Sequence, residues 1–158
     1  MLMLPQPECC FILGLPGAGK TMSAQMFMAD GREYSCIHFD LLRKALHGQD
    51  YIPEAEPWVE SIACAMTGHA LLDGQSVLID ESITTPHIAR SLIAIASQHH
   101  AKIRMVHINT PEEICRSRRV PNYMTEQEFS RKAREWSMYG ECILGLADET
   151  LIIHPPVE

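Results

Sequence analysis

Short apolar runs alternate with longer amphipathic stretches along the chain. The apolar runs have the length and the content of β-branched and aromatic residues that are typical of strands, and they occupy residues 9–13, 34–39, 76–79, 102–108 and 150–153. Between consecutive runs, apolar residues recur at helical spacing. Because the strands are apolar on both faces, we predict an α/β fold in three layers, in which helices flank a five-stranded parallel sheet.

Two of the predicted helices flank an acidic loop. Asp40 is placed as the N-cap of a short helix over residues 41–46. A loop with three acids and no base follows over residues 48–57, and Pro57 then begins a helix that ends at Gly74. That helix carries one apolar stripe, the face that an amphipathic helix turns to the core. The stripe consists of Trp58, Ile62, Ala65, His69 and Leu72.

The other helices are predicted from their first residues. Pro86 begins a helix that reaches His100, and Pro111 begins a shorter one that leads into a basic stretch. Thr125 has Glu128 three residues later, which is the spacing of a capping box, and it begins a last helix that runs to about Tyr139. We find no internal repeat and no linker, so we expect a single domain over residues 1–158.

Composition narrows the class of protein. The chain has 158 residues, of which 46% are hydrophobic, and a formal net charge of −7, which disfavours a protein that coats nucleic acids. No apolar run approaches the ~18 residues of a membrane span, so we expect a soluble protein with no membrane partner. The six cysteines show no C-x-x-C pair, and residues 1–6 do not resemble a secretion signal. We therefore expect reduced core cysteines and a cytoplasmic location.

The strongest motif follows the first predicted strand. Residues 14–21 fit the Walker A pattern G-x-x-x-x-G-K-[ST] at every fixed position and lie between a strand and a helix, as that pattern requires. Its backbone N–H groups, helix N-terminus and lysine ammonium suit nucleotide phosphates. We expect ATP to bind there, with Thr21 supplying a hydroxyl to Mg²⁺. The phosphate-binding residues are predicted to be Gly14, Pro16, Gly17, Ala18, Gly19, Lys20 and Thr21.

A carboxylate that orients the metal is expected at the end of a neighbouring strand. The run at residues 76–79 ends in Asp80 and Glu81. We assign Asp80 with Thr21 to the metal side and keep Glu81 as the alternative. The N-K-x-D pattern that reads guanine is absent, which disfavours a GTPase. A small enzyme that transfers a phosphoryl group remains, and it needs an acceptor site and a mobile basic lid.

The chain resembles the polynucleotide-kinase-like, or zeta-toxin-related, family of P-loop kinases, and specifically the 5′-hydroxyl kinase domain of phage-type polynucleotide kinase. Besides the Walker A motif, the resemblance covers D-x-x-R at 40–43, D-E-S at 80–82, the arginines from Arg116 and Val120-Pro121. It implies that Asp40 accepts the proton of the attacking hydroxyl and that Arg43 holds an acceptor phosphate. The alternative is that Asp40 is only a cap that pairs with Arg43.

A basic segment is the predicted lid. Residues 102–138 contain eight Lys or Arg and five Asp or Glu, a local charge of +3 in a chain of −7. By resemblance, Arg116 is the first candidate for the arginine that contacts the donor phosphates, and Arg119 is the second. A solvated helix face is the alternative. The predicted catalytic residues are thus Lys20, Asp40, Arg43 and Arg116.

The acceptor stays open at this point. The leading hypothesis is an ATP-dependent kinase that acts on a hydroxyl of a nucleic acid or nucleotide-like acceptor, with a kinase for hydroxymethyl bases in DNA as a variant. The alternatives are a kinase for a sugar, an antibiotic or a nucleoside, and a regulatory module that binds ATP without transfer. The acidic loop would repel a long phosphate backbone, although Tyr51 and Trp58 could stack on a base if they are not core residues.

Overall fold

One parallel sheet forms the centre of the protein. We describe the fold from a computed structural model, which describes residues 5–29 and 33–156; residues 1–4 of the N-terminal stretch considered above lie outside them. The five strands lie in the order β2-β3-β1-β4-β5 and every neighbouring pair is parallel. They are β1 (Glu8–Leu13), β2 (Tyr34–His38), β3 (Ser76–Asp80), β4 (Lys102–Ile108) and β5 (Glu149–Ile153). The predicted five-stranded α/β sheet is confirmed.

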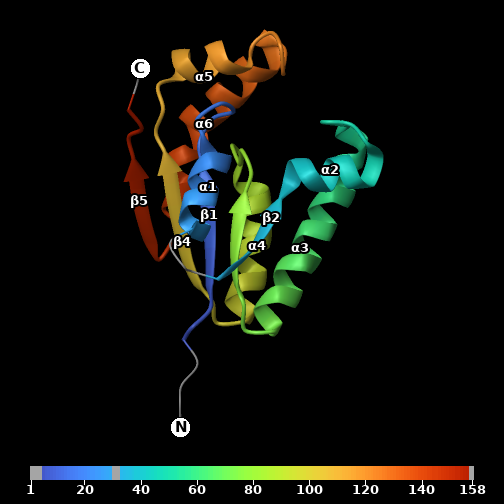
Figure 1. The fold of residues 1–158 in the computed structure, drawn as a ribbon, viewed down its shortest axis with the longest axis vertical. Coiled ribbons are helices and arrows are strands. Elements are labelled where there is room, and N and C mark those ends of the chain that lie inside the picture. The colour runs from blue at the N-terminus through green and yellow to red at the C-terminus, as the bar shows by residue number, and fades with distance from the viewer. Residues whose placement is uncertain (1–4, 30–32, 157–158) are drawn as a thin grey trace.

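Helices cover both faces of this sheet (Figure 1). They are α1 (Lys20–Ala29), α2 (Phe39–His47), the 3₁₀ turn η1 (Pro53–Ala55), α3 (Glu56–Leu72), α4 (Pro86–Gln98), α5 (Glu112–Arg119) and α6 (Glu126–Leu144). Alternate residues of β1 point to opposite faces, as the two-residue period of a strand requires. Phe11 belongs to the core cluster that includes α3 and α4, whereas Cys10 and Ile12 belong to the cluster that includes α1 and α5.

The carboxyl ends of three strands meet at one end of the sheet. Ile12 of β1 pairs in register with Asp80 of β3, and Asp80 in turn pairs with His38 of β2. The helices α2 and α5 lie at this same end, toward which the strand arrows point in Figure 1. In open parallel sheets, ligands bind outside the carboxyl ends of the strands. The register therefore brings together the loops that carry the predicted site.

The prediction that Asp40 caps a helix was wrong. The helix α2 begins at Phe39, its N-cap is His38, and no side chain caps it. Phe39 is 2% exposed, so its packing in the core extends the helix by two residues at its start. Asp40 therefore lies in the first turn of α2.

The predicted core stripe of the third helix was also wrong. Trp58 and Leu72 are 54% and 69% exposed, and Ala65 and His69 also face solvent. The buried residues of α3 form the adjacent stripe Val59, Ala63, Thr67 and Leu71. Small side chains face the core because α3 and α4 pack closely, and a Cβ added at Gly68 would lie 3.4 Å from Ile95 Cγ2. Trp58 and Tyr51 are therefore exposed aromatics and not core residues.

Several smaller expectations can be checked in the same way. The capping box of Thr125 and Glu128 is present, and α6 continues beyond Tyr139 to Leu144. Cys36 and Cys142 are exposed, so the prediction that the cysteines are core residues fails for them. Within the described parts of the chain, no helix has the length and apolar content needed to cross a membrane.

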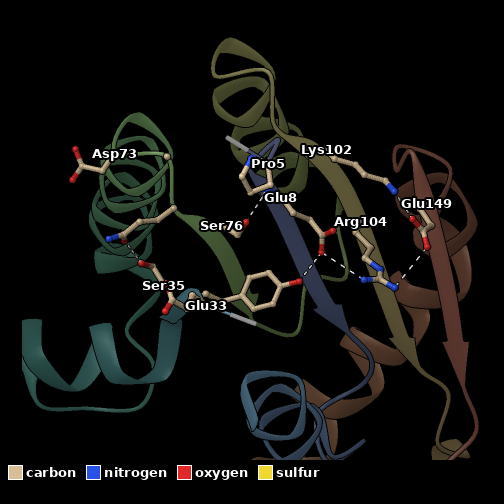
Figure 2. Close-up of a pocket in the computed structure, with 12 residues that line it drawn as sticks. Pro5, Glu8, Glu33, Ser35, Asp73, Ser76, Lys102, Arg104 and Glu149 are labelled. Atoms are coloured by element: carbon tan, nitrogen blue, oxygen red, sulfur yellow. Dashed lines mark hydrogen bonds and ion pairs between the residues drawn. The ribbon is translucent and has the colours of Figure 1, made fainter. Parts of the chain in front are cut away.

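A further cavity lies at the opposite, amino end of the strands (Figure 2). Its volume is about 910 Å³, and an ion-pair chain crosses it. Arg104 lies between Glu8 and Glu149, at 3.7 and 3.6 Å, and Lys102 Nζ lies 2.5 Å from Glu149. These side chains connect β1, β4 and β5. None of the predicted site residues lines this cavity. We therefore interpret its ion pairs as contacts that hold neighbouring strands of the sheet together.

Candidate functional site

The phosphate loop connects β1 to α1 and is anchored by hydrogen bonds. The backbone N–H of Ala18 donates to the carbonyl of Leu15 at 3.0 Å, and Lys20 Nζ donates to the same carbonyl at 3.0 Å. The hydroxyl of Thr110, beyond β4, donates to the carbonyl of Ala18 at 2.8 Å. These bonds hold the loop in shape and attach the ammonium of Lys20 to the backbone of the loop itself.

Gly17 explains why this loop lies against α5. Its φ of +87° is a conformation that residues with a side chain rarely adopt. An added Cβ would also lie 2.6 Å from the carbonyl oxygen of Cys115 and 2.9 Å from Cγ of Arg119. This close approach brings the basic end of α5 beside the phosphate loop.

The side chain of Lys20 is buried. It is 9% exposed, and burial lowers the pKa of its ammonium to about 8, although the carboxylates of Glu81 and Asp80 oppose the shift. A buried ammonium without an ion pair is costly for the fold. Such a cost is typical of a lysine that binds an anionic ligand, because the negative charge of the ligand stabilises the buried ammonium.

Thr21 and Asp80 form the side of the site that suits a metal ion. The hydroxyl of Thr21 donates to Asp80 Oδ2 at 2.9 Å, and His38 Nε2 lies 3.3 Å from the same oxygen. Hydroxyl and carboxylate oxygens are ligands that Mg²⁺ accepts, usually together with substrate phosphates and waters. The described residues contain no group of three or more His, Cys, Asp or Glu that could hold a metal. The hydroxyl of Thr21 and the carboxylate of Asp80 are thus two oxygen donors of the kind that Mg²⁺ accepts.

Arg43 is enclosed by three carboxylates. Its guanidinium donates to Asp40 at 2.8 Å, to both oxygens of Glu56 at 2.8 and 2.9 Å, and to Glu81 at 2.7 Å. Burial lowers the pKa of Arg43, but the hydrogen bond to Glu56 and the charges of all three acids outweigh it, so the pKa is raised. The structure thus separates the two acids at the end of β3: Asp80, its last residue, accepts a hydrogen bond from Thr21, and Glu81, the next residue, holds Arg43.

We expect Arg43→Ala to destabilise the protein by about 3–5 kcal/mol, because it leaves Glu56 and Glu81 without their cation. Their side chains are only 15% and 13% exposed. Urea denaturation followed by circular dichroism measures this change. As a matched control, Arg134→Ala removes an exposed arginine from α6 and is expected to change stability by less than about 0.5 kcal/mol. Equal stability of both variants would contradict the structural role of Arg43.

Asp40 lies where two cavities adjoin. It lines the cavity of about 490 Å³ that contains the phosphate loop, and it also lines a cavity of about 140 Å³ between α2 and α6. Its side chain is 63% exposed, and Oδ1 accepts the bond from Arg43. The predicted pairing of Asp40 with Arg43 is therefore present, and the carboxylate also faces the space beside the phosphate loop.

The basic end of α5 brings two arginines to the phosphate loop, but not Arg116. Arg118 and Arg119 line the phosphate-loop cavity, and Arg118 Nη1 donates to the carbonyl of Gly17 at 3.0 Å. The side chain of Arg116 instead pairs with Glu112 and Glu126 and lies over the ring of Phe129. Sequence reasoning passed over Arg118, although it stands within the basic run at the end of the predicted helix.

Another cavity, of about 160 Å³, adjoins the cavity of about 140 Å³ between α2 and α6. We call the two together the α2–α6 cavities. They share six lining residues, drawn from α2, from the loops after α2 and β3, and from α6. These are Arg43, Tyr51, Glu81, Ser82, Arg131 and Lys132. Arg131 and Lys132 were not singled out from the sequence, where they look like any charged helix face.

A family model gives the relationship. The model AAA_33, described as an AAA domain, matches residues 10–137, which include the phosphate loop, Asp40, Asp80 and the basic end of α5. The chain belongs to this family. No curated protein sequence matches the chain at a significant level. The matched range begins within β1, includes β2, β3 and β4, and leaves β5 outside.

Solved structures show that this AAA_33 chain has the fold of P-loop kinases. A chain of the Pnkp1/Rnl/Hen1 complex superposes with a TM-score of 0.66 at 18% identity, over 78% of this chain and only 42% of that one. Shikimate kinase from Acinetobacter baumannii gives 0.63 at 14%, over 97% and 87% of the two chains. The APS kinase CysC of Mycobacterium tuberculosis gives 0.60 at 17%, over 98% and 91%.

Proposed function

We propose that this protein is an ATP-dependent phosphotransferase that moves the γ-phosphoryl group to a hydroxyl of a nucleic acid or nucleotide-like acceptor. The observation that carries the proposal is the position of Asp40, at the junction between the phosphate-loop cavity and the α2–α6 cavities. A carboxylate at that junction is within reach of both a donor and an acceptor. The fold shared with P-loop kinases supports the same activity.

In the proposed reaction, an acceptor hydroxyl in the α2–α6 cavities gives its proton to Asp40 as its oxygen bonds to the γ-phosphorus. The bond from that phosphorus to the bridging oxygen breaks, and ADP leaves with the electron pair. Lys20, the backbone N–H groups of the loop, Arg118 and Arg119 face the negative charge during transfer. Mg²⁺ held by Thr21 and Asp80 would neutralise part of the phosphate charge.

The test is transfer of label from γ-labelled ATP to a panel of acceptors. The panel contains 5′-hydroxyl DNA and RNA, hydroxymethyl-base DNA, nucleosides, sugars and shikimate. We expect labelled product with at least one nucleic acid or nucleotide-like acceptor. ATP binding without transfer to any acceptor would instead favour the regulatory module. In that case Asp40→Asn should leave ATP binding unchanged.

A small-molecule acceptor is the second candidate, and the size of the site favours it. The α2–α6 cavities have volumes of about 140 and 160 Å³, and acidic residues line both of them, among them Asp50 in the first and Glu56 in the second. Such a space suits a sugar or a nucleoside better than a tract of polynucleotide. A preference for mononucleosides or sugars over oligonucleotides in the same panel would decide for this candidate.

We expect Arg119→Ala to raise the KM for ATP and to lower kcat, each by roughly tenfold or more, because Arg119 lines the phosphate-loop cavity. Arg116→Ala is the matched control, since its side chain is paired with Glu112 and Glu126. Steady-state kinetics with both variants distinguish the two arginines. If Arg116→Ala changes KM and kcat and Arg119→Ala does not, Arg116 is the arginine that contacts the donor phosphates, as the sequence analysis predicted.

ATP affinity is expected to fall as the pH rises above about 8, where Lys20 of the nucleotide-free protein loses its proton. Below that pH the ammonium of Lys20 is charged, so its titration should no longer change the affinity for ATP. Above it, Kd should rise by up to about tenfold per pH unit. Calorimetric titration between pH 7 and 9.5 measures the profile. Lys20→Met should bind more weakly but without this dependence, and a flat wild-type profile would contradict the assignment.

A further inference from the structure

Lys132 of α6 differs from the other cations that line the α2–α6 cavities. Its side chain is half-buried, and its Nζ makes one long hydrogen bond, 3.5 Å to the carbonyl of Ser82. Among the described residues, no carboxylate oxygen lies within ion-pair distance of that ammonium. Glu128 and Glu135, one helical turn away on either side, feel its charge without touching it.

Two of the remaining cations of these cavities are held by carboxylates. Arg43 is held by three carboxylates, and Arg131 donates to Glu135 at 2.7 Å. The third, Arg119, has a buried Nε with no hydrogen-bond partner among the described residues, but it also faces the phosphate-loop cavity. Its guanidinium lies over the ring of Tyr123, at 5.0 Å. Lys132 lines the α2–α6 cavities and not the phosphate-loop cavity, although its charge still acts on Lys20, whose pKa it helps to lower.

We infer that Lys132 is the residue that binds an oxyanion of the acceptor, a role that the resemblance gives to Arg43. The inference rests on the proposed phosphotransferase function and names the chemistry of its acceptor. The acceptor carries a phosphate or a carboxylate group close to the hydroxyl that is phosphorylated. Lys132 offers three donors, of which the bond to Ser82 uses one weakly.

The charges around Lys132 limit the acceptor to few negative groups. The residues that line the α2–α6 cavities include seven carboxylates and four cations. A polyanion that filled this space would meet repulsion from most of its neighbours. A single oxyanion placed at Lys132 instead forms a charge-assisted hydrogen bond, which is about twice as strong as a neutral one. The site therefore favours an acceptor, or an acceptor end, with one anionic group.

The experiment measures binding of inorganic phosphate to protein that is saturated with Mg²⁺ and the non-hydrolysable analogue AMP-PNP, so that the donor site is filled. Phosphate binding is followed by the ³¹P line width of the free ion, and acetate competes in a parallel titration. We expect Lys132→Gln to weaken phosphate binding by about tenfold or more, and Lys132→Arg to retain part of it. Affinity for Mg·AMP-PNP should change much less than affinity for phosphate, because Lys132 does not line the donor cavity.

Arg134→Gln is the matched control, because Arg134 is exposed on the same helix and lines neither cavity. Competition by acetate would extend the oxyanion to carboxylates, and its absence would restrict it to phosphates. Unchanged phosphate binding in Lys132→Gln, no phosphate binding to the loaded wild type, or an equal loss of AMP-PNP affinity would overturn the role of Lys132. Failure of the wild type to bind Mg·AMP-PNP would contradict the proposed function, and this inference with it.

Discussion

Lys20→Met is expected to slow phosphate transfer strongly and, at the same time, to stabilise the protein without nucleotide. Transfer should fall by roughly 10²- to 10³-fold, the typical effect of removing one preorganised charge from a transition state. Stability should rise because burial lowers the pKa of Lys20 to about 8, so the folded state binds this proton less tightly than the unfolded chain does. Below pH 8 both states are protonated, and the folded protein carries the whole cost.

The gain in stability is expected to be of the order of 1–3 kcal/mol near neutral pH. In the wild type, the cost disappears as the pH rises from about 8 toward the pKa of an ordinary lysine, so the two proteins should become more alike there. Methionine leaves no unpaired group, because the carbonyl of Leu15 keeps the bond from the N–H of Ala18. Thermal unfolding at several pH values measures the difference.

Lys102→Met is the matched control for this experiment. Lys102 lies at the opposite end of the sheet, where its Nζ is 2.5 Å from Glu149, and its substitution should leave transfer unchanged. A variant at Lys20 that keeps near-wild-type turnover would contradict the role of the loop in phosphate binding. A variant that loses both turnover and stability would show that Lys20 supports the fold.

The sheet and the phosphate loop could be predicted because their signals are local. Parallel strands covered on both faces are continuous apolar runs, and residues 102–108 and 76–79 needed no further context. The Walker A motif fixes backbone conformation and charge within eight residues. The pairing of Thr21 with Asp80 then follows from the parallel register of β1 and β3, which places the carboxyl ends of both strands at the same end of the sheet.

The buried face of α3 could not be predicted, because the helix has two stripes that both look suitable for a core. The stripe with Trp58 and Leu72 is larger and more apolar, whereas the stripe that is buried contains Ala63 and Thr67. The choice depends on how closely α4 approaches α3, and that distance is set by the whole fold. Hydrophobic periodicity gives the period of a helix and leaves its rotation to tertiary packing.

The partners of the arginines were hidden for a related reason. Arg43 receives two of its three carboxylates from Glu56 and Glu81, which lie 13 and 38 residues away in sequence. The sequence shows only its neighbour Asp40 as a possible partner, and the matching family position suggests a cation that is available to an acceptor phosphate. Arg116 likewise finds Glu126 in the next helix. Which cation stays available for a ligand depends on these long-range pairs, and in this chain they leave Lys132 available.

Asp40→Asn is expected to lower kcat by roughly 10²- to 10⁴-fold while ATP affinity and stability stay close to those of the wild type. The amide keeps the shape of the side chain, and its oxygen still accepts the bond that Arg43 donates to Asp40. It cannot take the proton of an acceptor hydroxyl. Since the helix begins at Phe39 with His38 as its N-cap, the substitution removes no cap. An exposed side chain at this position also contributes little to stability.

The measurement is single-turnover transfer at saturating ATP, beside calorimetric binding of Mg·AMP-PNP, so that chemistry and donor binding are recorded separately. Asp73→Asn, at the far end of α3, is the matched control and should leave both unchanged. A loss of nucleotide affinity equal to the loss of rate would place Asp40 among the donor contacts. An unchanged rate would leave its pairing with Arg43 as its whole role, and the base would then have to be sought among the other carboxylates of the α2–α6 cavities, of which Glu81 also borders the phosphate loop.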